Sequence, residues 1–146
     1  MSQNNKQVTY DDNNIFAKML SGDIPYHKVY EDEKTLAFMD IMPQAEGHVL
    51  VIPKQKAFDL ADLEPQYAAA VLMTCKKVMQ AQRQVFEREG IIQMQLNGAQ
   101  AGQTVFHYHV HLIPSSIHEL GRHAVTQVEN DQLADMAKKL ATAIES

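Results

Sequence analysis

The chain has 146 residues, of which 45% are hydrophobic and 21% are charged, a balance typical of one soluble globular domain. Its formal net charge of -5 excludes the basic surface usual in proteins that bind nucleic acid, although backbone amides and a few cations can still bind one phosphate group. No apolar run approaches the length of a membrane span, and the lone Cys75 allows no intramolecular disulfide. The sequence therefore predicts a cytoplasmic protein that binds neither nucleic acid nor membrane.

The first predicted element follows a polar, amide-rich segment. Residues 1–13 are predicted to be a flexible tail, and residues 14–146 a single domain. Asn13 or Asn14 can cap a short helix over Ile15–Ser21, and Gly22 is a suitable end. Three short strands are predicted next, at Lys28–Glu31, Thr35–Asp40 and His48–Ile52.

The longest predicted helix lies in the middle of the chain. Pro65 suits its first turn and Gly90 its end, which predicts a helix over Pro65–Glu89. Cys75 lies within the apolar stripe of this helix, so we expect a buried structural thiol.

Two strands and a last helix complete the predicted fold. Ile91–Asn97 alternates apolar and polar residues, and Thr104–Ile113 forms the last strong strand pattern. Asn130 or Asp131 can cap a final helix. The pattern predicts an α+β domain with about five mostly antiparallel strands, one long helix packed on the sheet, a short N-terminal helix and a C-terminal helix.

Three histidines alternate within the last predicted strand. Strand side chains point to opposite faces in turn, so His107, His109 and His111 should share one face while their apolar neighbours face the core. One histidine in a strand is usually structural. Three in strict alternation are harder to explain by packing, because both nitrogens of each ring need partners.

A metal site is one interpretation of this row. At ~3.3 Å per residue, His107 and His111 start about 13 Å apart, too far to converge easily on one ion. Two of the three could chelate, but further ligands are scarce. The other histidines stand alone at predicted turns, where we expect solvent-exposed spectators; they are His27, His118 and His123.

Nucleophilic catalysis is the better interpretation. A neutral imidazole can attack phosphorus and form an intermediate that water cleaves, and His109 has a histidine on each side to orient it or to move protons. The loop before the row contains two glycines, whose amides can approach an anion closely. Its side-chain donors are Asn97, Gln103 and Thr104.

The segment Gly102–Pro114 resembles the signature of the histidine-triad nucleotide-binding and hydrolase family. Further blocks match that family in order and extend the resemblance from about residue 14 to residue 114. These blocks are Asn14–Lys18, Gly22–Pro25, Lys28–Asp32, Leu36–Asp40 and Gly47–Lys54.

The resemblance implies a site for a purine nucleoside monophosphate. His109 would attack the α-phosphorus, with His107 and His111 flanking it and His48 as an additional histidine nearby. Asp40 matches the residue that binds the ribose hydroxyls. The other implied nucleotide contacts are Phe16, Met19, Ile24 and Ile41 around the base, and Asn97, Gln103 and Thr104 around the phosphate or leaving group, with Gly102 and Val105 beside them.

One departure from the family concerns metal. Many bacterial members bind zinc through a Cys-x-x-Cys motif near the first helix, a later histidine and the first histidine of the triad. The corresponding positions here hold Asn14, Ala17 and Lys56, so we expect neither a metal ligand at His107 nor any cofactor.

Two further departures concern the substrate. Phe106 precedes the triad, as in the phosphoramidase branch, where the dinucleoside-polyphosphate hydrolases tend to have proline. Ser115 and Ser116 replace a common arginine, and segment 115–129 has no match.

The resemblance therefore implies a hydrolase that acts at the α-phosphate of nucleoside 5'-phosphoramidates or related adenylates through a covalent nucleotidyl-histidine. The alternatives are a dinucleoside polyphosphate hydrolase, a nucleotide-binding interaction protein with little turnover, and a metal-dependent enzyme. The family commonly forms homodimers, for which Pro65–Glu89 and Ile91–Asn97 are the expected interface.

Overall fold

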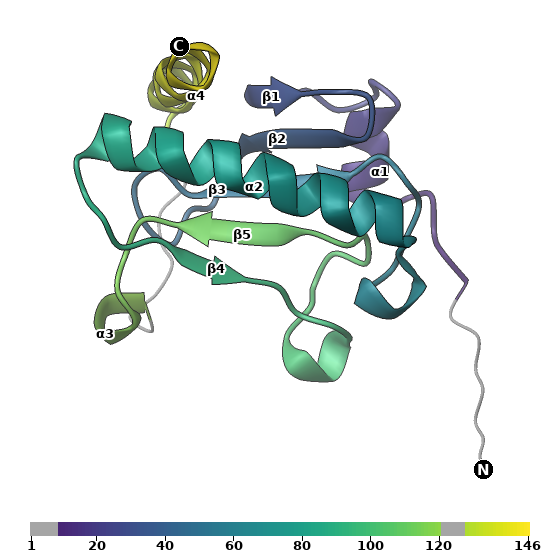
Figure 1. The fold of residues 1–146 in the computed structure, drawn as a ribbon. Helices are drawn as coiled ribbons and strands as arrows, with labels where there is room; N and C mark the ends of the chain where they lie inside the picture. Colours follow the sequence, from purple (N-terminus) through teal and green to yellow (C-terminus); the bar gives the residue numbers. More distant parts are fainter. Residues whose placement is uncertain (1–8, 121–127) are drawn as a thin grey trace.

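The computed structural model describes residues 9–120 and 128–146, and within them it contains a five-stranded antiparallel sheet in the order β1-β2-β3-β5-β4 (Figure 1). The strands are β1 (Lys28–Glu31), β2 (Thr35–Met39), β3 (Val49–Pro53), β4 (Ile92–Met94) and β5 (Val110–Ile113). The helices are α1 (Ile15–Leu20), α2 (Pro65–Phe86), α3 (Ile117–Leu120) and α4 (Asn130–Glu145), with 3-10 turns η1 (Leu60–Asp62) and η2 (Ala99–Ala101). The predicted α+β class and its long helix are confirmed.

Helices cover both faces of the sheet. The long helix α2 lies across one face and packs with α4, and α1 covers part of the other (Figure 1). Strand β3 shows the alternation: Val49 and Val51 belong to the core under α2, whereas Leu50 and Ile52 pack with Phe16 of α1. Every residue of β2 and β3 is buried, which explains their continuous apolar sequence.

The ends of the helices agree with the sequence in part. Asn14 caps α1, since its Oδ1 accepts the Ala17 N–H at 2.9 Å. Helix α2 begins at Pro65 as predicted but ends at Phe86, because Glu87 adopts the left-handed conformation (φ 51°) before Gly90 is reached. The predicted cap of α4 is wrong: Asn130 is already helical, and its Oδ1 lies 3.3 Å from the His27 ring nitrogen Nε2.

The two strands of the second half are shorter than predicted. Pairing of β4 with β5 runs from Ile92 opposite Ile113 to Met94 opposite His111, so residues 104–109 lie outside the ladder. The Tyr108 N–H instead donates to the Ala57 carbonyl at 2.8 Å. The His107 ring likewise contacts the end of β3, since its Nε2 lies 2.9 Å from the Pro53 carbonyl oxygen.

Cys75 is buried in the core under α2, as predicted. Burial disfavours the charged thiolate and raises the pKa of Cys75 to about 12. The thiol is therefore structural. No helix within the described residues is both long and apolar enough to span a membrane.

Candidate functional site

Four histidines from two parts of the chain meet on the face of the sheet that α1 covers. His111 lies in β5 opposite Leu50, and His107 and His109 precede it, while His48 comes directly before β3. The predicted alternation is confirmed, because the intervening Tyr108, Val110 and Leu112 all lie in the core under α2. The ring centroids of His109 and His111 are 5.0 Å apart, and those of His48 and His111 are 5.1 Å apart.

His109 has the tautomer that a nucleophile requires. Its Nδ1 lies 2.6 Å from the His107 carbonyl oxygen, which can only accept, so Nδ1 carries the proton and Nε2 carries the lone pair. Among the described residues, no hydrogen bond reaches Nε2. Burial lowers the pKa of His109, which keeps the ring neutral. The Phe16 ring packs edge to face against the His109 ring, with centroids 5.0 Å apart.

The position of the proton on His111 is fixed by its neighbours. The backbone N–H of Gln44 donates to Nδ1 of His48 at 3.1 Å, so the proton of a neutral His48 is on Nε2. That Nε2 lies 2.9 Å from Nδ1 of His111, which therefore accepts, leaving the proton of His111 on Nε2. Burial and neighbouring imidazoles lower the pKa of His48 to about 3 and that of His111 to about 4. His111 can thus donate an N–H to a bound phosphate oxygen.

His107 is fully buried and bonded at both ring nitrogens. Its Nε2 donates to the Pro53 carbonyl at 2.9 Å, and its Nδ1 accepts from the Tyr10 hydroxyl at 2.5 Å. Burial lowers the pKa of His107 to about 4, so this ring is also neutral. Tyr10 lies within the segment 1–13 that the sequence assigns to a tail, and residues 1–8 of that segment lie outside the described residues.

Asp40 lies at the edge of the histidine cluster. Its Oδ2 is 3.5 Å from Nε2 of His48, and its Oδ1 accepts the Met42 N–H at 2.9 Å. Burial raises the pKa of Asp40, but the carboxylate keeps some exposure and has lone pairs to accept further hydrogen bonds. It is placed to bind hydroxyl groups beside the imidazoles.

The residues assigned to the base are brought together in part. Phe16 and Met19 are buried and Ile24 is partly buried in one apolar cluster with Phe38. Ile41 is 45% exposed at the start of the loop after β2. The cluster therefore offers an apolar wall next to His109, with Ile41 outside its buried part.

The amide side chains of the glycine loop bond to backbone groups of the loop itself and of Phe58 and Leu60. Gln103 is buried: its Oε1 accepts the Gly98 N–H at 2.7 Å, and its Nε2 donates to the carbonyls of Phe58 and Val105. Asn97 accepts the Leu60 N–H at 2.9 Å through Oδ1. The other three residues of this group are Gly102 in a left-handed conformation, exposed Thr104 and partly buried Val105. Gln103 thus braces the loop that precedes the histidines.

Within the described residues, Asp40, His48 and His111 are close enough to hold a metal ion, with one ligand atom from each within 4.8 Å of the others. The Gln44 N–H argues against this use. It requires a lone pair on Nδ1 of His48, so Nε2 keeps its proton and cannot coordinate a cation. The geometry fits a chain of hydrogen bonds better than a metal centre.

The residues of this chain also do not fit the zinc site that the resemblance describes. Lys56 places an ammonium where a histidine is expected and pairs with Asp12 at 2.8 Å. Asn14 uses its side chain to cap α1, and Nδ1 of His107 accepts from Tyr10. An ammonium at position 56 and a hydroxyl that donates to His107 do not fit a zinc site built from these positions.

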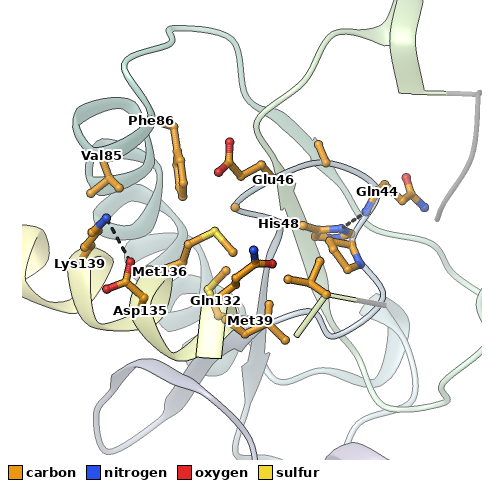
Figure 2. A pocket seen from close by; sticks show the side chains of 15 residues that line it. Met39, Gln44, Glu46, His48, Val85, Phe86, Gln132, Asp135, Met136 and Lys139 are labelled. Carbon is orange, nitrogen blue, oxygen red and sulfur yellow. Dashed lines mark hydrogen bonds and ion pairs between the residues drawn. The ribbon is translucent and has the colours of Figure 1, made fainter. Parts of the chain in front are cut away.

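A cavity of about 700 Å³ lies between the loop before His48, the end of α2 and the helix α4. Figure 2 shows Phe86, Met136 and Lys139 on its walls, with His48 and its bond to Gln44 at one side. None of the three alternating histidines lines this cavity. Of the four clustered histidines, only His48 lines this cavity.

The fold and the site together define an α+β protein with a buried cluster of neutral histidines, in which the Nε2 lone pair of His109 has no hydrogen-bond partner among the described residues. The HIT domain model matches residues 21–118, and the chain belongs to the HIT-domain family. It is 45% identical to the protein Hit of Bacillus subtilis over 103 residues, 70% of this chain and 71% of the relative. It is 41% identical to adenosine 5'-monophosphoramidase of Schizosaccharomyces pombe over 107 residues, 73% of this chain and 77% of that one.

Solved structures of the family have the same fold. A Hit-like protein from Bartonella henselae gives a TM-score of 0.86 with 41% identity, covering 93% of this chain and 99% of that chain. A zinc-bound histidine triad protein from Mycobacterium smegmatis gives a TM-score of 0.77 with 31% identity, covering 91% of this chain and 94% of that chain. Zinc is thus bound by one relative, while the residues of this chain do not fit the zinc site that the resemblance describes.

The buried neutral imidazoles predict a loss of stability in mild acid. An unfolded histidine has a pKa of about 6.5, whereas burial lowers the pKa of His107 and of His111 to about 4. Between these pH values the unfolded chain binds more protons, so the free energy of unfolding falls as the pH falls from about 6.5 toward about 4. Urea unfolding should show a loss of ~2 kcal/mol for each such imidazole between pH 7 and pH 5. A His107→Gln variant should lose less free energy of unfolding between pH 7 and pH 5 than the wild type. An equal loss would contradict the lowered pKa of His107.

Proposed function

We propose that the protein hydrolyses nucleoside 5'-phosphoramidates or related adenylates at the α-phosphate through a covalent nucleotidyl-His109. The observation that carries this proposal is the hydrogen bond from Nδ1 of His109 to the His107 carbonyl, which directs a lone pair from Nε2 into the site. The relative from Schizosaccharomyces pombe, an adenosine 5'-monophosphoramidase, supports the same reaction class.

The reaction has two steps. Nε2 of His109 attacks the α-phosphorus, and the leaving nitrogen departs with the electron pair of the P–N bond and takes up one proton from solvent. Water then attacks phosphorus, the P–Nε2 bond breaks, and the nucleoside monophosphate and one proton are released. The His107 carbonyl accepts the Nδ1 proton throughout, so it stabilises the positive charge that the ring carries while phosphorus is attached.

The neighbouring groups have distinct proposed roles. His111 donates its Nε2–H to a non-bridging phosphate oxygen, and His48 keeps it in that tautomer. Asp40 accepts from the ribose hydroxyls, and the apolar cluster around Phe16 contacts the base. The same nucleophile could attack a phosphoanhydride, so dinucleoside polyphosphates are the alternative substrate class.

The test is a comparison of substrates with a search for the intermediate. Adenosine 5'-phosphoramidate and a diadenosine polyphosphate are assayed side by side, and rapid quench measures nucleotide bound to protein. We expect the larger kcat/KM for the phosphoramidate and a transient nucleotidyl-protein. A larger value for the polyphosphate would support the alternative hydrolase. Tight AMP binding without turnover or intermediate would support an interaction protein.

A homodimer through α2 and β4 and a cytoplasmic location are also part of this proposal. Leu72 and Met73 of α2 are 54% and 57% exposed, and β4 is an edge strand of the sheet. An apolar helix surface and an unpaired edge near it are typical of an interface between two copies. The lone buried Cys75 is consistent with a reducing compartment.

A further inference from the structure

A contact between the N-terminal segment and the histidine cluster has no role in the steps above. Tyr10 is separated from His107 by 97 residues, yet its hydroxyl lies 2.5 Å from Nδ1 of that ring. The two rings also meet edge to face, with centroids 5.7 Å apart. Burial raises the pKa of Tyr10, so its hydroxyl keeps the proton that it donates.

The Tyr10 hydroxyl completes the bonding of His107. The Pro53 carbonyl accepts from Nε2 at 2.9 Å, so Nδ1 of the neutral ring needs a donor, and Tyr10 supplies it. Without this donor, a fully buried ring nitrogen would lose its partner in the described structure. The ring would then be held at one nitrogen and could change tautomer or tilt.

His107 transmits this restraint to the nucleophile. Its backbone carbonyl is the group that accepts the Nδ1 proton of His109, at 2.6 Å. A shift of His107 therefore changes the direction of the Nε2 lone pair of His109. A small change in the direction of this lone pair lowers the rate strongly, because attack on phosphorus requires close alignment.

Two further contacts hold the segment that carries Tyr10, both on its C-terminal side. Asp12 pairs with Lys56, three residues beyond Pro53, at 2.8 Å. Asn14 donates through Nδ2 to the Asp11 carbonyl at 2.8 Å while it caps α1. The exposed ion pair is weak alone, but the three contacts place one short segment over His107.

We propose that Tyr10 is a positioning residue for the reaction, whose hydroxyl fixes the tautomer and the ring of His107 and, through the His107 carbonyl, the aim of His109. The inference rests on the proposed function for its effect on rate. It also explains how this chain holds the first histidine of the row with residues that do not fit zinc. Tyr10 acts through His107 and does not itself contact the reacting atoms.

The test is the Tyr10→Phe variant, which keeps the ring and removes the hydroxyl. We expect kcat to fall about five- to tenfold, the size expected for one lost hydrogen bond, with KM changed less than twofold. The matched control is Tyr30→Phe, which removes a hydroxyl that donates to Asp32 at 3.0 Å, away from the histidines. Its kcat should remain that of the wild type.

A second measurement does not depend on turnover. Nitrogen-15 NMR of the free protein reports the tautomer and hydrogen bonding of His107, and we expect its Nδ1 resonance to move in Tyr10→Phe and to stay in Tyr30→Phe. If the wild-type protein does not hydrolyse the substrates, the proposed function is refuted. A shift of the His107 Nδ1 resonance in Tyr10→Phe would still support the restraint by Tyr10. An unmoved resonance overturns the inference, as does a loss of kcat no larger than that of the control.

Discussion

Replacing His109 with alanine is expected to lower kcat on adenosine 5'-phosphoramidate about a thousandfold or more and to abolish the nucleotidyl-protein. The other three imidazoles cannot take over its role. His107 is bonded at both ring nitrogens. The lone pair of neutral His48 accepts from the Gln44 N–H, and that of His111 accepts from His48. Rapid-quench and steady-state assays measure the two effects.

The control for this variant is His118→Ala, which removes an exposed histidine of α3. It should retain the rate of the wild type. AMP should still bind His109→Ala within a few-fold of the wild type, because the proposed contacts to base and ribose are intact. Equal rates for His109→Ala and the wild type would remove His109 as the nucleophile.

The alternation of the histidines could be predicted from the apolar residues between them, because Tyr108, Val110 and Leu112 belong in the core. Residues 104–109 lie outside the ladder, yet His107 and His109 still point away from the core that holds Tyr108. The length of the strand could not be predicted. It depends on the pairing of β5 with both neighbours, which reaches Val110 on the β3 side and His111 on the β4 side, and that is a tertiary property.

Two hydrogen-bond partners of the histidines could not be predicted from the sequence, because no residue pattern indicates them. Gln44 acts through its backbone N–H, which any residue except proline has, so its side chain carries no signal. Tyr10 meets His107 across 97 residues from a polar segment that resembles a tail. For Gln103 the sequence suggests a phosphate donor, but in the structure its amide bonds to the backbone of Gly98 and Phe58.

Gly47 joins the loop of Gln44 to His48, and its replacement by alanine is expected to reduce stability strongly. Its φ is +85°, a conformation that costs a residue with a Cβ, and the added Cβ would lie 2.6 Å from Cζ of Phe86. The Gly47 carbonyl also accepts from the buried Gln82 amide at 2.9 Å, so the backbone is held against movement. Backbone strain and overpacking together should lower the free energy of unfolding by ~3 kcal/mol, measured by urea unfolding.

Gly22→Ala separates the two causes of the Gly47→Ala effect. Gly22 has nearly the same φ, +87°, but a Cβ added there would have nothing within 4 Å, so alanine at this position carries the backbone strain alone, ~1 kcal/mol. The difference between the two variants is the clash with Phe86, and a double-mutant cycle with Phe86→Leu should recover most of it. Because the same loop presents the Gln44 N–H to His48, Gly47→Ala should also lower kcat, whereas Gly22→Ala should not. Equal losses of stability in the two glycine variants would show that the Phe86 ring moves away from the added Cβ at no cost in free energy of unfolding.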